Sequence, residues 1–379
     1  MPDNPLLELA RRGQSPWLDD LRREYFTAGT LRRLIDTDGL RGVTSNPTIF
    51  DRAISGSAAY DAEIRAAVAD RLDPGQAFER LAVAEIQRAC DLFGPLYEKT
   101  GGGDGFVSLE VSPDLAHETE GTLAEARRLW IAVGRPNALI KVPGTPAGLP
   151  AIRKLLAEGI NVNITLLFSV ANYRQVHAAY IEALTERDRL GMGLDQVASV
   201  ASFFVSRVDT EVDRRLEELV AKAKGAEREH LESLRGKAAI ANARVAYRDF
   251  LVVTKTAEWR RVAAKQARLQ RPLWASTGSK NPAYRDVIYV EELIGENTVN
   301  TMPLATLDAF RDHGEVSESL LRDPEGSVAT LRALAEAGID LDDVTAKLQR
   351  DGVKSFKDSF DSLLAGVEKK MTALAGRGA

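Results

Sequence analysis

Eight short apolar segments, separated by longer stretches with helical periodicity, constrain the fold of this chain most strongly. We expect strands near residues 16–20, 42–46, 106–111, 138–143, 161–168, 200–206, 272–277 and 298–303. Helical periodicity fills most of the gaps, as it does over 77–100 and 121–134. Eight strands that alternate with helices predict an α/β fold in which parallel strands close into a (β/α)8 TIM barrel with additional helices.

A doubly wound open sheet is the competing architecture. It would place a G-x-G-x-x-G motif after the first strand, and the chain has no such motif there. A Walker A sequence is also absent. The glycine-rich stretch GGGDG at 101–105 is better interpreted as a turn before a strand than as a phosphate loop.

The 379 residues are long enough for one large barrel, and we expect a single domain over 1–379. The longest insertion, at about 208–270, is rich in Glu, Lys, Arg and Ala, which predicts helices with solvated faces. Residues 316–375 are expected to form further helices that pack on the barrel. The last five residues, 375–379, are expected to fray.

Composition excludes several classes of function. A net charge of −5 argues against a nucleic-acid-binding protein, and no segment is long and apolar enough to span a membrane. The N-terminal residues lack the apolar core of a signal peptide, and the single Cys90 cannot form an internal disulfide. The four histidines show no metal-ligand spacing. We therefore expect a cytoplasmic protein that uses no metal and is a monomer or a homodimer.

One lysine is out of place in this pattern. Lys141 stands in the middle of the apolar segment ALIKVP, 138–143. Burying a charge without a partner is costly, so the lysine must be neutral, paired, or directed into a polar cavity. Each of these cases points to chemistry more than to packing.

Polar side chains recur at the ends of the expected strands. They are Asp19, Thr44, Asn46, Glu110, Lys141, Asn163, Thr165, Ser202, Arg207, Ser276, Ser279 and Lys280. In a parallel barrel the carboxyl ends of all strands open on one face, where active sites lie. These side chains are therefore expected to converge.

Several of these residues also have an ordinary structural interpretation. Asp19 could cap a helix, and Asn46 before a proline is common in turns. Arg207 could pair with a surface acid. Glu110 and Lys141 each interrupt an apolar strand, and they could form a buried structural ion pair. The convergence of a lysine, two acids and several amides favours a catalytic site.

Such a set of residues permits a specific reaction. A lysine among apolar groups and near another cation has a pKa below its usual ~10.4. The neutral amine can attack a ketone and form a Schiff base, whose iminium withdraws electrons from a neighbouring carbon–carbon bond. One carboxylate would take the proton of the hydroxyl group at the bond that breaks, and another acid would assist imine formation. Arginine and lysine would bind a phosphate.

The sequence resembles the transaldolases, of the longer bacterial type. The similar segments run in the family's order over nearly the whole chain. They are GLRGVTSNPTIFDRAI (39–54), VSLEVSPDLAHET (107–119), ALIKVPGTPAGLPAIRKLLAEGINVNITLLFS (138–169), SFFVSRVD (202–209) and RPLWASTGSKNPAYRD (271–286).

The resemblance implies a class I aldolase-type barrel with the Schiff-base lysine on the fourth strand, where Lys141 lies. The implied reaction is the reversible transfer of a dihydroxyacetone unit in the non-oxidative pentose phosphate pathway. The donor would be sedoheptulose 7-phosphate or fructose 6-phosphate, and the acceptor glyceraldehyde 3-phosphate or erythrose 4-phosphate. No cofactor is implied.

The resemblance also implies roles by position. Lys141 would form the Schiff base, Asp19 would handle the hydroxyl proton, and Glu110 would act through a water held by Thr165. Substrate binding is implied for Thr44, Asn46, Asn163, Ser202 and Phe204. Phosphate binding is implied for Arg207 and Lys280, with Ser276 or Ser279.

The chain departs from the family's pattern at two places. The segment STGSKNP after the seventh strand carries Lys280 where many members have arginine, so a point charge replaces a bidentate fork. Two acids, Asp19 and Asp20, follow the first strand. Asp19 matches the catalytic position, and Asp20 is then expected to cap the next helix.

Two alternative functions stay open. Fructose 6-phosphate aldolase-like relatives are shorter and carry glutamine at the position of Glu110 and tyrosine at that of Phe204, so both residues favour transfer. A non-catalytic sugar-phosphate-binding barrel would be indicated by loss of Lys141 or of either acid, and all three are present.

Overall fold

The fold is described from a computed structural model, which covers residues 4–375. Eight parallel strands form a closed barrel in the order of the sequence, from β1 to β8. They are β1 (Gln14–Leu18), β2 (Gly42–Val43), β3 (Phe106–Glu110), β4 (Ala138–Pro143), β5 (Val162–Leu167), β6 (Ser199–Phe204), β7 (Arg271–Ala275) and β8 (Thr298–Met302). The predicted TIM barrel is confirmed.

The strands lie at the predicted places; β4 has the predicted bounds, and the other strand ends differ from the prediction by at most three residues. β2 is the shortest, because after Gly42–Val43 the chain turns into a helix that starts at Pro47. Gly42 lies against the indole of Trp17, and a Cβ there would come within 2.5 Å of the ring. β1 ends at Leu18, so Asp19 and Asp20 lie beyond it.

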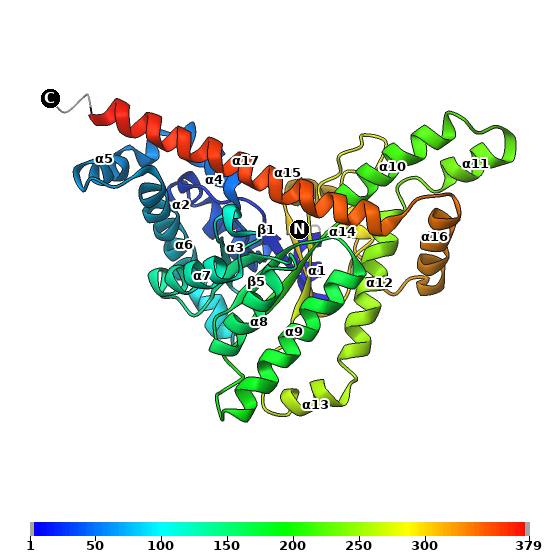
Figure 1. The fold of residues 1–379 in the computed structure, drawn as a ribbon, viewed down its shortest axis with the longest axis horizontal. Helices are drawn as coiled ribbons and strands as arrows, with labels where there is room; N and C mark the ends of the chain where they lie inside the picture. The colour runs from blue at the N-terminus through cyan, green and yellow to red at the C-terminus, as the bar shows by residue number, and fades with distance from the viewer. Residues whose placement is uncertain (1–3, 376–379) are drawn as a thin grey trace.

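Helices surround the barrel (Figure 1). They are α1 (Pro5–Arg11), α2 (Arg23–Thr27), α3 (Thr30–Asp38), α4 (Pro47–Ser55), α5 (Asp61–Ala69), α6 (Pro74–Lys99), α7 (Thr119–Val133), α8 (Gly148–Glu158), α9 (Val170–Arg189), α10 (Ser206–Val220), α11 (Gly225–Ser233), α12 (Ala238–Val253), α13 (Ala257–Ala263), α14 (Ile288–Glu291), α15 (Leu304–His313), α16 (Pro324–Glu336) and α17 (Leu341–Ala375), with 3-10 turns Ala58–Tyr60 and Pro113–Leu115.

Local sequence signals explain where long helices begin. Asp73 and Gln76 form a capping box at the start of α6, and Pro74 occupies the first turn, where a missing N–H costs nothing. The insertion predicted at 208–270 forms α10 to α13, and the region predicted at 316–375 contains α16 and α17. The fraying expected for 375–379 concerns residues 376–379, which lie outside the described part, and Ala375, which ends α17.

The strands are buried along almost their whole length, as expected for parallel strands with helices on one face and a packed interior on the other. Aromatic side chains pack against the strands. The rings of Phe203 and Trp274, for example, pack edge to face with their centroids 6.1 Å apart. Within residues 4–375, no helix is both long and apolar enough to cross a membrane.

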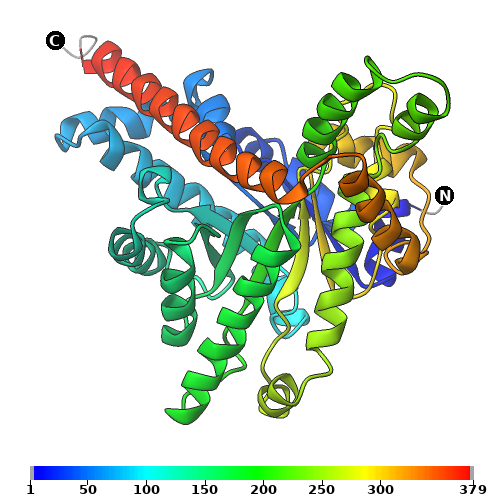
Figure 2. The same cartoon turned by 45° about the vertical axis from the view of Figure 1, so that its right-hand side comes forward.

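Helix α17 has a special position. Its 35 residues run across one end of the barrel as a nearly straight rod, coloured orange to red in Figures 1 and 2. Its buried positions include Phe356, and Thr48 of α4 donates a hydrogen bond of 2.8 Å to Ser359. The last helix of the chain therefore covers the end of the barrel at which the strands finish.

Candidate active site

A cavity of about 230 Å³, here called the mouth cavity, opens at the carboxyl ends of the strands. It is lined by Asp19, Thr44, Asn46, Thr48, Ile49, Arg52, Lys141, Thr165, Ser202, Phe204, Arg207, Ala275, Ser276, Gly278, Lys280, Thr301, Pro303 and Phe356. Most of the polar side chains selected from the sequence therefore converge in one place. Glu110, Asn163 and Ser279 do not line it.

Lys141 lies at the centre of this group. Strand pairing places it beside Glu110 of β3 on one side and Asn163 of β5 on the other. Its Nζ donates hydrogen bonds of 3.0 Å to Glu110 Oε2 and 3.1 Å to the backbone carbonyl of Ser45. It also lies 5.3 Å from the ring centroid of Phe356. The lysine is 96% buried. Its hydrogen bonds hold it in one orientation at the wall of the cavity.

Glu110 contacts the lysine from behind the cavity wall. The ion pair expected as a structural alternative exists, and both side chains in it are 5% exposed. Burial raises the pKa of Glu110, while the charge of Lys141 and its hydrogen bond act in the opposite direction. A carboxyl group with a raised pKa can both give and take protons, so the ion pair and a catalytic role are compatible.

Asp19 faces the same cavity from the end of β1. Thr44 Oγ1 donates a 2.7 Å hydrogen bond to Asp19 Oδ1, and it lies 2.7 Å from Thr301 Oγ1. Burial raises the pKa of Asp19, against the influence of Lys141, the hydrogen bond from Thr44 and the charge of Arg207. Two buried carboxyl groups therefore approach one lysine from different strands.

The prediction that Asp20 caps the following helix is wrong. Helix α2 begins only at Arg23, its N-cap residue is Arg22, and no side chain caps it. Asp20 instead accepts hydrogen bonds of 2.5 Å from Arg22 and from the hydroxyl of Tyr25. Asp20 lies two residues before the N-cap position of α2, so its carboxylate does not bond to the free amides of the helix's first turn.

Thr165 Oγ1 and Glu110 Oε1 share an unusual property. Each is buried and has no hydrogen-bond partner within residues 4–375. Buried polar atoms normally have partners, so unpartnered ones near the buried Lys141 are candidates for contact with a small molecule.

The other side of the cavity is cationic. Arg207, at the start of α10, has its guanidinium 5.4 Å above the ring of Phe204, and burial lowers its pKa. No ion pair joins Arg207 to an acid in the described chain, so the alternative of a pair with a surface acid does not hold. Lys280 comes from the loop after β7. These two cations suit an anionic group of a ligand.

The two serines after β7 are not equivalent. Ser276 lines the cavity, has φ of +56°, and has its hydroxyl 3.0 Å from that of Ser206. Ser279 donates to the carbonyl of Asn281 and does not line the cavity. The sequence did not decide whether Ser276 or Ser279 would bind the phosphate, and the geometry favours Ser276.

Asn163 was expected to line the site and lies one layer below it. Its amide nitrogen donates to Ser108 at 3.0 Å, and its oxygen accepts from Ser202 at 2.7 Å. Side chains of alternate strand residues stack in layers inside a barrel, and Asn163 belongs to the layer that supports Ser202. Asn46, by contrast, lines the cavity and also caps α4 by accepting from Ile49 N.

Some lining residues were missed by sequence reasoning. Thr48, Ile49 and Arg52 follow the TSNP segment on α4, and a helical face starting at Asn46 could have indicated them. Phe356 has no such signal, because it is one of many apolar positions on α17. In the described part of the chain, no group of three or more His, Cys, Asp or Glu is arranged to hold a metal ion.

Comparison with known proteins agrees with this geometry. The model of the family described as "Transaldolase/Fructose-6-phosphate aldolase" matches residues 16–367. The chain is 44% identical over 377 residues to a protein of Trichodesmium erythraeum named "Transaldolase", with 99% of each chain covered. It is 48% identical over 373 residues to a protein of the same name from Saccharopolyspora erythraea, with 98% of this chain and 99% of the relative covered. A third relative with this name, from Parafrankia sp., is 47% identical over 373 residues, with 98% of this chain and 99% of the relative covered.

Proposed function

This chain belongs to the transaldolase/fructose-6-phosphate aldolase family, and from this premise we propose that it transfers a dihydroxyacetone unit between sugar phosphates. The donor would be sedoheptulose 7-phosphate or fructose 6-phosphate, and the acceptor glyceraldehyde 3-phosphate or erythrose 4-phosphate. The observation that carries the proposal is Lys141, a buried lysine on β4 at the wall of a polar cavity, with Glu110 and Asp19 beside it.

The reaction begins with attack of Lys141 Nζ on the ketone carbon of the donor. The hydrogen bonds to Glu110 and to the Ser45 carbonyl direct the nitrogen and limit its rotation. Loss of water from the carbinolamine gives the iminium and needs a proton donor. The proton that Lys141 gives up to Glu110 frees the amine for attack, and Glu110 then passes this proton to the leaving hydroxyl through a water that contacts Thr165. The unpartnered Glu110 Oε1 and Thr165 Oγ1 support this arrangement.

Asp19 then takes the proton from the hydroxyl group next to the bond that breaks. The electron pair of that bond moves into the iminium, the aldose product leaves, and a three-carbon enamine stays on Lys141. Addition of the second aldehyde and hydrolysis of the new iminium run through the same steps in reverse. The raised pKa of Asp19 suits a group that must return the proton in each cycle.

The substrate's phosphate lies on the cationic side of the cavity. Arg207 and Lys280, with the hydroxyl of Ser276, provide charge and hydrogen-bond donors there. Thr44, Asn46, Ser202 and Phe204 line the same cavity and would contact the three-carbon unit. Asn163 supports Ser202 from below.

An aldolase that only cleaves fructose 6-phosphate is the competing activity within the family. Glu110 and Phe204 stand where such relatives were expected to carry glutamine and tyrosine, which favours transfer over cleavage. The acceptor decides between the two activities, because a transferase releases little free dihydroxyacetone when an aldose phosphate is present.

The test is trapping with borohydride in the presence of fructose 6-phosphate, followed by peptide mass mapping. A reduced three-carbon adduct on Lys141 is expected. An adduct on a different lysine would contradict the assignment of the nucleophile. Folded protein that gives no adduct on any lysine would instead support a barrel that binds sugar phosphates without turning them over.

A further inference from the structure

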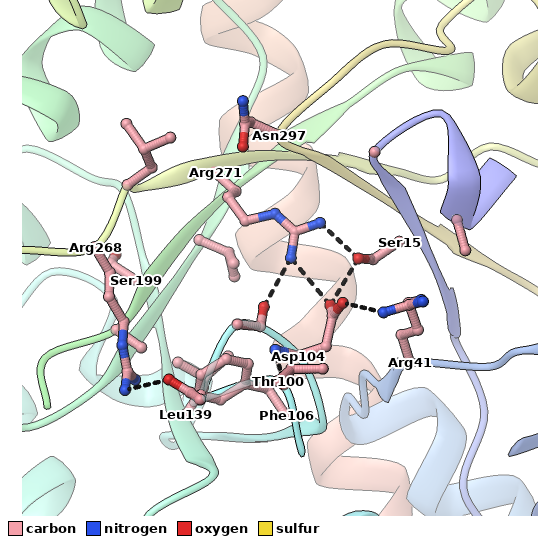
Figure 3. A pocket seen from close by; sticks show the side chains of 18 residues that line it. Ser15, Arg41, Thr100, Asp104, Phe106, Leu139, Ser199, Arg268, Arg271 and Asn297 are labelled. Carbon is pink, nitrogen blue, oxygen red and sulfur yellow. Dashed lines mark hydrogen bonds and ion pairs between the residues drawn. The ribbon is translucent and has the colours of Figure 1, made fainter. Parts of the chain in front are cut away.

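A second cavity, of about 350 Å³, lies at the opposite end of the barrel from Lys141. We call it the base pocket. Its walls come from the starts of strands and from the loops before them, including Ser15 of β1, Phe106 of β3 and Ser199 of β6 (Figure 3). It therefore belongs to the face where the strands begin, and none of its lining residues is shared with the mouth cavity.

Positive charge predominates in this pocket. Its lining contains three arginines, Arg41, Arg268 and Arg271, and one acid, Asp104. Arg41 and Arg271 approach Asp104 from two directions, with N–O distances of 2.8 and 3.0 Å (Figure 3). Arg268 lies apart from them and forms no ion pair within the described residues. Three guanidinium groups against one carboxylate leave two positive charges unbalanced.

The guanidiniums also have unused hydrogen-bond donors. Nε of Arg41, Nε of Arg271 and Nη1 of Arg268 are buried and have no partner in the described chain. Arginine does not lose its proton in proteins, so it cannot relieve this cost by becoming neutral. The excess positive charge in one pocket is the feature that an anion with several oxygen acceptors would balance.

The glycine-rich stretch 101–105 forms one wall of the pocket. Gly102 has φ of +76°, and a Cβ there would lie 2.3 Å from Arg268 Nη2, so only glycine lets the loop close over this guanidinium. Arg268 Nη2 donates to the Gly101 carbonyl at 3.1 Å, and its guanidinium lies 5.9 Å from the ring of Tyr97. The stretch thus fixes an arginine in the wall.

The loop itself does not bind the anion. The amides of Gly101, Gly102 and Gly103 donate to carbonyls of Glu98, Tyr97 and Thr100, and the amide of Asp104 donates to the hydroxyl of Thr100. The expectation that this stretch is a turn before a strand is confirmed. Recognition of an anion falls to the side chains of Arg41, Arg268 and Arg271.

We propose that the base pocket binds a small phosphate-bearing anion, held by these three guanidiniums. The pocket is large enough for a phosphate monoester as well as for free phosphate. Two positive charges match the charge of a phosphate dianion. Binding there is separate from the proposed reaction, because the pocket holds none of the residues that line the mouth cavity.

The test compares ligand-induced changes in melting temperature for the wild type, Arg268→Gln and a control, Arg228→Gln, at constant ionic strength. Arg228 is an exposed arginine of α11 whose one ion-pair partner within residues 4–375 is Glu232. Phosphate at the mouth contributes equally in all three proteins, so the difference isolates the base pocket. We expect saturating phosphate to raise the melting temperature of the wild type and the control by about 2 °C more than that of Arg268→Gln.

Titration with glycerol 3-phosphate distinguishes the source of the anion. A larger effect than that of inorganic phosphate identifies an organic phosphate as the ligand, and an equal effect identifies phosphate itself. Equal increases in all three proteins with both ligands would overturn the proposal. If Arg268→Gln does not fold, Arg268→Lys keeps the charge and removes the planar fork, and the same comparison applies with a smaller expected difference.

Discussion

The two ends of the barrel contain the same kinds of charged side chain and differ in how these are bonded. At the base, both oxygens of Asp104 accept hydrogen bonds, from Arg41, Arg271 and the hydroxyl of Ser15. At the mouth, Glu110 Oε1 has no partner in the described chain. Burial raises the pKa of Glu110 and Asp19 and lowers that of Arg207.

This difference separates groups that hold structure from groups that can react. A carboxylate whose two oxygens both accept hydrogen bonds from guanidinium groups is held in one place by those contacts. A buried carboxyl group with a free oxygen can gain and lose a proton. Substitutions at the mouth should therefore change rates, and substitutions at the base should change stability.

The largest effect is expected for Lys141→Ala. Removing the nucleophile should lower kcat by about 10⁴-fold or more, because the other described lysine that lines the cavity, Lys280, comes from the loop after β7 and does not stand in the place of Lys141 on β4. The fold should persist, since the truncation enlarges an existing cavity. Steady-state assays with far-UV circular dichroism measure both quantities. The matched control is Lys354→Ala, at a 75% exposed position of α17, and it should behave as the wild type. Substantial activity in Lys141→Ala would exclude a Schiff base at this residue.

Asp19→Asn and Glu110→Gln should each lower kcat by roughly 10² to 10⁴-fold, at different steps. Asp19→Asn should slow carbon–carbon cleavage, while Schiff-base formation continues. Glu110→Gln should slow formation and hydrolysis of the imine. Rapid-quench experiments with borohydride follow imine formation, and release of the aldose product follows cleavage. If both variants stopped at the same step, the proposed division between the two acids would be wrong.

Asp104→Asn tests the other end of the barrel. It leaves two partly buried guanidiniums without their counter-charge, which should lower the free energy of unfolding by about 3 kcal/mol. Activity at a temperature well below unfolding should stay within about twofold of the wild type. Urea unfolding and steady-state kinetics provide the two values. Asp70→Asn, at an exposed ion pair with Arg80, is the control and should change stability little. A large loss of kcat in Asp104→Asn would remove the distinction between the two ends.

The smallest effect is expected for Arg207→Ala. Loss of one charge-assisted contact to phosphate should raise the KM for fructose 6-phosphate by about tenfold, with a smaller change in kcat. The same variant should bind unphosphorylated fructose as weakly as the wild type does. Arg214→Ala, an exposed position on the same helix, serves as the control. An unchanged KM for the phosphorylated donor would mean that Arg207 does not contact the phosphate.

The sequence predicts the parts of this site that lie on strands. Lys141 and Glu110 interrupt apolar segments, and the parallel pairing of neighbouring strands then makes them neighbours. It does not predict depth within the barrel, which is why Asn163 was expected in the cavity and lies below it. The prediction for Asp20 was wrong for a related reason. The sequence pattern does not show how many residues separate the end of β1 from the start of the next helix.

The sequence pattern does not predict contacts between segments that are far apart in the chain. Arg41 and Asp104 come from loops and Arg271 from the start of β7, and they meet at the base although they are far apart in the sequence. Each looks like an ordinary surface residue by itself. Phe356 belongs to an amphipathic helix whose sequence does not say which part of the barrel it will cover. Only the closed barrel brings these residues together.

Because Phe356 lies near the C-terminal end of the chain, the mouth cavity acquires its full lining only late in synthesis. The ribosome makes the chain from its N-terminus, so Lys141 emerges 200 residues before Leu341, the first residue of the helix that contributes Phe356 to the mouth cavity. In a barrel that has formed before α17 is synthesised, the amine of Lys141 is open to water on the side that Phe356 later covers. The finished surroundings of the lysine, including the aromatic ring 5.3 Å from its nitrogen, exist only after the end of the chain has folded back across the strands.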